Sequence, residues 1–94
     1  MLEITNGQNG EVLLAGRFDA AQVDKAKNFF ANVNQGTTLD FASLDYISSA
    51  GLGILLATQK RLKDGGHGLR LVNLNSHIRD VLRLSGFDQI FEMG

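Results

Sequence analysis

Two sequence periods alternate along this chain of 94 residues, and their order constrains the fold more than any other feature. After a first pair of strand-like segments, stretches whose apolar residues recur every three or four positions alternate with short β-rich stretches. Strands joined through helices need crossover connections, which favour parallel pairing. The sequence therefore predicts an α/β fold in which a mixed sheet has its helices packed largely on it.

The predicted order of the elements is β β α β α β α. Leu2–Ile4 and Val12–Leu14 alternate with polar residues on either side of "NGQNG", which is typical of a β-hairpin. Further strands are predicted at Thr37–Phe41 and at 68–74, and "FDQIFEM" (87–93) is assigned to a short final strand or a docking tail.

Each of the three predicted helices starts at a polar residue and stops at a glycine. The helices run from Asp19 to Gly36, from Ser49 to Gly65-Gly66, and from Asn75 or Ser76 to Gly86. In the first helix, Gln22 lies three residues after the predicted N-cap Asp19, so these two residues form a capping-box pattern.

Length and composition limit the possible functions. The chain is long enough for one domain, residues 1–94. A formal net charge of −1 without any basic block argues against nucleic acid as a partner. Cysteine is absent and the two histidines are isolated, so no metal site is predicted. The N-terminal residues lack a secretory signal pattern, and no apolar run approaches the ~20 residues that span a bilayer. We expect a cytoplasmic domain without membrane insertion.

The segment "LDYISSAGLGILL" (44–56) places two serines where a strand is predicted to stop and a helix to start. Serine is a favoured N-cap residue, so one interpretation is that Ser48 or Ser49 only caps the helix. Capping does not explain Gly51 and Gly53, because each glycine within a helix costs roughly 1 kcal/mol relative to alanine. Either a partner approaches Ser49 closely, or the helix packs tightly on the sheet, and the residues leave both explanations open.

The same segment does not predict an enzyme. "ISSAG" ends like a nucleophile elbow, but Ile47 occupies the position where that strained turn needs a small residue. His67 follows the helix and is expected about 25 Å from Ser49, since a helix rises 1.5 Å per residue. His77 opens another helix, without further support for a triad, and no P-loop is present. We expect a binding module without catalytic residues, cofactor or metal.

Three segments resemble, in this order, successive blocks of the STAS domain family, which includes the bacterial anti-sigma factor antagonists. They are "GRFDAAQVDKAK", "TTLDFASLDYISSAGLGILLATQKRLKDGG" and "LRLVNLNSHIRDVLRLSGFDQIFE". The resemblance covers essentially the whole chain, and its most specific part is Ser-Ser-Ala-Gly-Leu-Gly at the helix entrance. It implies a mixed sheet with helices on one face, in agreement with the pattern above.

The resemblance also implies partner switching. An unphosphorylated antagonist binds a serine-kinase anti-sigma factor of the GHKL type, phosphorylation of one serine ends the binding, and a PP2C-type phosphatase restores it. The acceptor falls on Ser49, with Ser48 as the alternative, because many antagonists carry an aspartate at the position of Ser48. The residues predicted for partner binding are Asp19, Asp45, Ser48, Ser49, Ala50, Gly51 and Leu52. STAS domains also serve as accessory subunits of lipid-transport ABC systems, which is the second interpretation.

Overall fold

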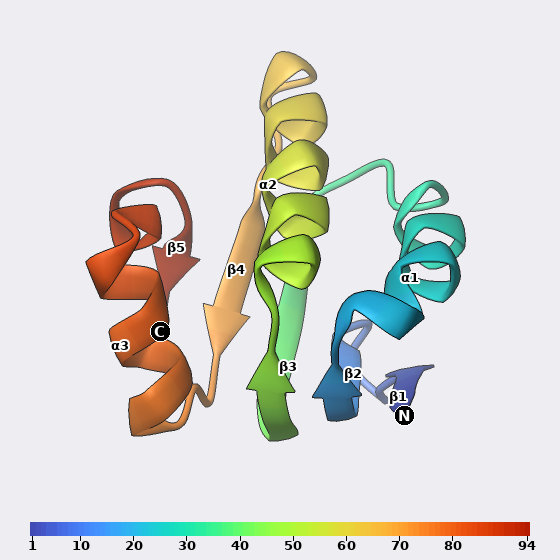
Figure 1. Ribbon diagram of the computed structural model, residues 1–94. Helices are drawn as coiled ribbons and strands as arrows, with labels where there is room; N and C mark the ends of the chain where they lie inside the picture. The colour runs from blue at the N-terminus through green and yellow to red at the C-terminus, as the bar shows by residue number, and fades with distance from the viewer.

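A five-stranded mixed sheet with three α-helices on one side forms the domain in the computed structural model, which describes residues 1–94 (Figure 1). The strands are β1 (Leu2–Asn6), β2 (Val12–Phe18), β3 (Thr37–Ile47), β4 (Leu69–Val72) and β5 (Glu92–Met93). The helices are α1 (Val23–Phe30), α2 (Ser49–Asp64) and α3 (Ser76–Leu84), with 3-10 turns at Ala20–Gln22 and Phe87–Gln89.

The strands lie in the sheet in chain order, β1-β2-β3-β4-β5. β1 and β2 form the predicted antiparallel hairpin, and the other neighbouring pairs are parallel. The C-terminal segment adds the short strand β5 to the edge of β4, which decides between the two predicted alternatives for this segment. The predicted α/β class and element order are therefore confirmed.

One apolar core fills the space between the sheet and the helices. Its nineteen buried side chains come from the strands, all three helices and the C-terminal segment, so no part of the chain has a separate core. The helices contribute apolar residues to this core, including Ala26 and Phe30 of α1 and Ile78 and Leu82 of α3. α2 lies in the middle of the helical layer between α1 and α3 (Figure 1).

The first helix is shorter than predicted at both ends. Residues 20–22 form a 3-10 turn, and Asp19 precedes this turn without any side-chain capping bond. The predicted capping box is therefore wrong. At the other end α1 stops at Phe30 instead of reaching Gly36. Residues 32–35 are Asn-Val-Asn-Gln, and asparagine and valine are weak helix formers, which explains the early end.

β3 is six residues longer than predicted, because it continues along β2 to Ile47. Its register with β2 shifts twice, and at the second shift Gly16 pairs with Leu44 while Arg17 pairs with Tyr46. Asp45 is thus an extra residue in β3, as in a β-bulge. Gly16 has a φ of +90°, and a Cβ at this position would collide with the carbonyl oxygen of Met1. Only glycine suits this conformation.

The outer edge of β1 is covered in part by side chains of the segment that follows β2. The backbone N–H of Leu2 donates to Oε1 of Gln22 at 3.3 Å, and Nζ of Lys25 donates to the carbonyl oxygen of Leu2. Gln22 therefore bonds a strand edge in place of the predicted helix cap. These two contacts satisfy backbone groups that an edge strand otherwise leaves to solvent.

Candidate functional site

The two serines lie at the junction between β3 and α2, as the sequence predicts. β3 ends at the buried Ile47, and α2 begins at Ser49. The backbone N–H of Ser48 donates to the carbonyl oxygen of Phe18 at 2.8 Å, so the end of β2 fixes the start of α2. We refer to residues 48–52 as the α2 entrance.

The third helix also starts at this edge of the sheet. Asn75 caps α3, because its Oδ1 accepts a hydrogen bond from the N–H of Ile78 at 2.8 Å. Its Nδ2 donates to the carbonyl oxygen of Leu44 at 3.3 Å, which ties the start of α3 to β3. Asn75, rather than Ser76, is therefore the N-cap residue.

Ser48 and Ser49 have different roles in the fold. Ser48 is the N-cap of α2, and its Oγ accepts a hydrogen bond from the N–H of Gly51 at 3.1 Å. Ser49 is the first helical residue, is exposed, and makes no side-chain hydrogen bond. The amides of Ser49 and Ala50 donate no hydrogen bond within the chain. A free hydroxyl therefore lies beside two free donors at a helix N-terminus, where negative charge is favoured.

The two glycines of this helix also differ. Gly51 is buried, and a Cβ at this position would lie 3.0 Å from side-chain carbons of Phe18 and Ile47. Tight packing on the sheet accounts for Gly51. Gly53 is exposed, and a Cβ there would meet no atom outside the helix within 4 Å. Internal packing therefore does not account for Gly53.

The other predicted partner-binding residues divide into exposed and buried ones. Asp45 and Ala50 are exposed, whereas Leu52 is 6% exposed and belongs to the core. Leu52 and Gly51 can therefore affect partner binding only indirectly, by fixing the position of α2.

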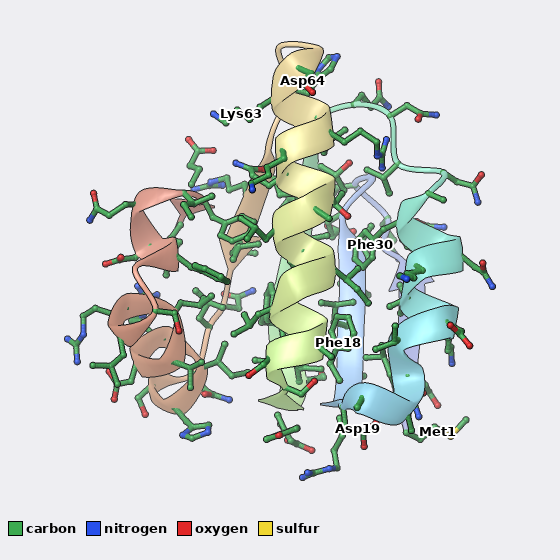
Figure 2. All side chains as sticks on the ribbon, turned by 45° about the horizontal axis from the view of Figure 1, so that its top comes forward. Met1, Phe18, Asp19, Phe30, Lys63 and Asp64 are labelled. Carbon is green, nitrogen blue, oxygen red and sulfur yellow. The ribbon has the colours of Figure 1, made fainter.

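Asp19 is the unusual carboxylate of this edge. It directly follows Phe18, whose carbonyl oxygen binds Ser48, and it lies at the end of the molecule where α2 begins, opposite Lys63 and Asp64 (Figure 2). Its Oδ1 is buried and has no hydrogen-bond partner. Buried polar atoms are nearly always hydrogen-bonded, so this oxygen is an acceptor without a donor in the free chain.

Neither histidine is hydrogen-bonded to Ser49. His67 follows the C-terminal end of α2, at the opposite end of the helix, as expected. His77 is exposed in the first turn of α3 and makes no hydrogen bond to Ser49. No group of three or more His, Cys, Asp or Glu residues is placed to hold a metal ion. None of the helices combines the length and the apolar character needed to cross a membrane.

Two features near the site were not predicted from the sequence. The guanidinium group of Arg17 on β2 lies over the ring of Tyr46 on β3, 4.3 Å from the ring centroid. Tyr46 directly follows the bulge residue Asp45. A groove also runs between α1 and α2, from Ala50 to Arg61 along α2. Both depend on distances between elements that are far apart in the sequence, and no local pattern signals them.

Comparisons with known proteins agree with this arrangement. The chain matches the family "Mlab, STAS domain" over residues 2–93. It is 41% identical over 88 residues to the candidate anti-sigma factor antagonist BtrV of Bordetella bronchiseptica, covering 94% of this chain and 68% of BtrV.

Solved structures show the same fold at low sequence identity. An anti-sigma factor antagonist from Mycobacterium paratuberculosis has a TM-score of 0.82 at 20% identity, over 99% of this chain and 83% of that one. The unphosphorylated anti-sigma factor antagonist SpoIIAA has a TM-score of 0.73 at 16% identity, over 100% of this chain and 87% of that one. By its sequence match along nearly its whole length and by its fold, the chain belongs to the STAS domain family.

Proposed function

We propose that the protein is a bacterial anti-sigma factor antagonist that acts in the cytoplasm by partner switching. The unphosphorylated chain binds a serine-kinase anti-sigma factor of the GHKL type, and phosphorylation of Ser49 releases it. A PP2C-type phosphatase then restores the binding form. The protein itself is a binding module and not an enzyme. The relationship to BtrV supports this class of function, because the two chains share 41% identity.

The observation that carries the proposal is the difference between the two serines. Ser48 Oγ is used by the helix cap, whereas Ser49 Oγ is exposed and free of hydrogen bonds. A kinase therefore reaches Ser49 without opening the helix. This difference favours Ser49 over Ser48 as the phospho-acceptor.

A phosphate on Ser49 suits the fold and opposes the partner. It adds about −1.5 to −2 charges at a helix N-terminus, where the free amides of Ser49 and Ala50 favour an anion. α2 has no basic residue in its first turn to neutralise that charge. A charge buried without a counter-ion in an interface costs several kcal/mol, and 2.8 kcal/mol corresponds to about 100-fold in affinity.

The unpartnered Oδ1 of Asp19 supports a partner contact at the same edge. A buried acceptor without a donor is unfavourable in the free chain by roughly 1–3 kcal/mol. A turn of the Asp19 side chain on binding, which brings this oxygen to an N–H or guanidinium donor of the partner, removes that penalty. Asp19 is therefore proposed to contact the anti-sigma factor directly, together with the exposed Asp45 and Ala50.

The switch is tested with the kinase that co-purifies with the tagged chain. We expect phosphate transfer from ATP to wild type and to Ser48→Ala, but not to Ser49→Ala. We expect Ser49→Asp to keep the circular dichroism spectrum of the wild type and to lose about 100-fold or more in affinity by isothermal titration calorimetry. Phosphate uptake by Ser49→Ala but not by Ser48→Ala would move the site by one residue.

An accessory role in a lipid-transport ABC system is the second candidate. It is favoured by membership of the STAS domain family, which includes such subunits, and by Ser48 at the position where many antagonists carry an aspartate. The same purification separates the two candidates. Recovery of an ABC ATPase with its permease, and of no serine kinase, would replace the proposed function by this one.

A further inference from the structure

The groove between α1 and α2 has a volume of about 450 Å³ and is open to solvent. Its floor is apolar, with Val23 and Phe30 from α1 and Ile54 from α2. It extends along α2 from Ala50 to Arg61, which is about 16 Å at a rise of 1.5 Å per residue. This length equals about three turns of an α-helix.

Three of the α2 residues that line the groove are small. Ala50, Gly53 and Ala57 are exposed and line it at a spacing of three and four residues. Gly53 lowers the stability of the free helix by roughly 1 kcal/mol, and no atom of another element occupies the space above it. This loss of helix stability has an explanation if the backbone of another molecule approaches α2 closely at Gly53, because a larger side chain there would prevent the approach.

The charge of the groove selects the kind of partner. Lys27 and Arg61 line it, and no carboxylate does. The chain's two ion pairs, Arg70–Glu92 and Arg83–Asp80, involve neither of them. Arg61 donates from Nη2 to the carbonyl oxygen of Phe30 at 2.7 Å, and its other N–H donors remain available. Two unpaired cations beside an apolar floor favour an amphipathic partner with negative charge.

We propose that the anti-sigma factor lays an amphipathic α-helix into this groove, with Asp or Glu side chains facing Lys27 and Arg61. A helix of three turns matches the groove's length, and helices that dock in this way anchor through residues at i, i+3, i+4 and i+7. The small residues permit close backbone approach, which a flat surface of long side chains does not. A second copy of this chain fits less well, because the same cations on both copies repel each other.

This proposal rests on the proposed function and extends it from the α2 entrance. The groove begins at Ala50, the residue next to Ser49. A helix that fills the groove therefore reaches the neighbourhood of the phospho-acceptor at one end. Phosphorylation then acts at the end of a larger interface, most of which lies farther along α2.

The probe is the anti-sigma factor that co-purifies with wild type, expressed separately and titrated by calorimetry against variants of the full chain. We expect Gly53→Leu, which fills the groove, to weaken binding by about 30-fold or more, and Lys27→Glu by about tenfold. Lys60→Leu and Lys60→Glu are matched controls on an exposed α2 position outside the groove, and we expect both within about threefold of wild type. Circular dichroism checks that each variant is folded.

Hydrogen exchange on the anti-sigma factor tests the occupant. We expect protection, on binding, of a helical segment with apolar residues at i, i+3 or i+4 and i+7 and with carboxylates beside them. Protection confined to loops or strands would overturn the proposal. So would self-association of wild type that disappears in Gly53→Leu, or a bound amphiphile that native mass spectrometry finds on wild type and not on this variant.

Ser49→Asp separates this proposal from the proposed function. If Ser49→Asp loses the anti-sigma factor and Gly53→Leu binds it like wild type, the groove proposal is wrong and the switch stands. If Gly53→Leu loses the anti-sigma factor and Ser49→Asp binds it like wild type, the switch at Ser49 is wrong and the groove remains the docking site.

Discussion

The two faces of the first turns of α2 use the same residue types for opposite purposes. On the inner face, Ser48 caps the helix and Gly51 packs against Phe18 and Ile47. On the outer face, Ser49 leaves its hydroxyl free and Gly53 leaves open space above the helix. The inner pair is explained by the stability of the fold, and the outer pair is not. A serine or glycine that no contact within the fold explains is therefore a better guide to function than the presence of serine or glycine in the sequence.

Among the substitutions that test this comparison, Gly51→Val is expected to change the free energy of unfolding the most. A Cβ at position 51 would lie 3.0 Å from side-chain carbons of Phe18 and Ile47, so valine displaces these side chains or the helix. We expect a loss of about 1–3 kcal/mol in the free energy of unfolding, measured by urea denaturation.

Gly53→Val is the matched control for this change. Its side chain enters open space, so the free energy of unfolding should change by less than about 0.5 kcal/mol. Equal losses in the two variants would mean that α2 does not have distinct inner and outer faces at these positions.

Ser48→Ala is expected to have the next largest effect. The substitution removes the oxygen that accepts the N–H of Gly51, and loss of an N-cap costs about 1 kcal/mol. Thermal and urea unfolding should show this loss, whereas Ser49→Ala should stay within about 0.5 kcal/mol of wild type. The reverse order of stability would assign the cap to Ser49.

Among the substitutions that are expected to change stability, Gly53→Ala has the smallest effect, and a favourable one. Alanine is about 0.5–1 kcal/mol better than glycine within a helix, and its methyl group meets nothing outside α2. Urea unfolding should show this gain. In the partner titration the same variant should bind less tightly, because the added methyl group occupies part of the groove. A gain in both stability and affinity would contradict a close backbone approach at Gly53.

Local patterns were enough to predict the element order, the hairpin and the strand–helix junction at the two serines. They failed where several residues compete for one role. Asp19 and Gln22 match a capping box, but Gln22 is within reach of Leu2 on the sheet edge and bonds there instead. The extension of β3 beyond Phe41 depends on bulged pairing with β2, which no period-two pattern reveals.

The candidate site was predicted in position but not in detail. The sequence located the two serines at a helix start, and it left open which of them is the cap and why Gly51 and Gly53 are glycines. Those answers depend on which side chains of β2 and β3 lie beneath α2. The groove depends on the distance between α1 and α2, which the sequence of neither helix determines.

The partly covered edge of β1 has a consequence for the tendency of the protein to aggregate. The sequence of β1, Leu-Glu-Ile-Thr-Asn, contains no lysine or proline, the residues that commonly keep edge strands from pairing with other chains. Gln22 and Lys25 supply this protection from outside the strand, since both backbone groups of Leu2 are already occupied. An incoming strand must displace two side chains before it can pair with Leu2. Crowded copies of the chain therefore meet a barrier against edge-to-edge aggregation that the strand sequence itself does not show.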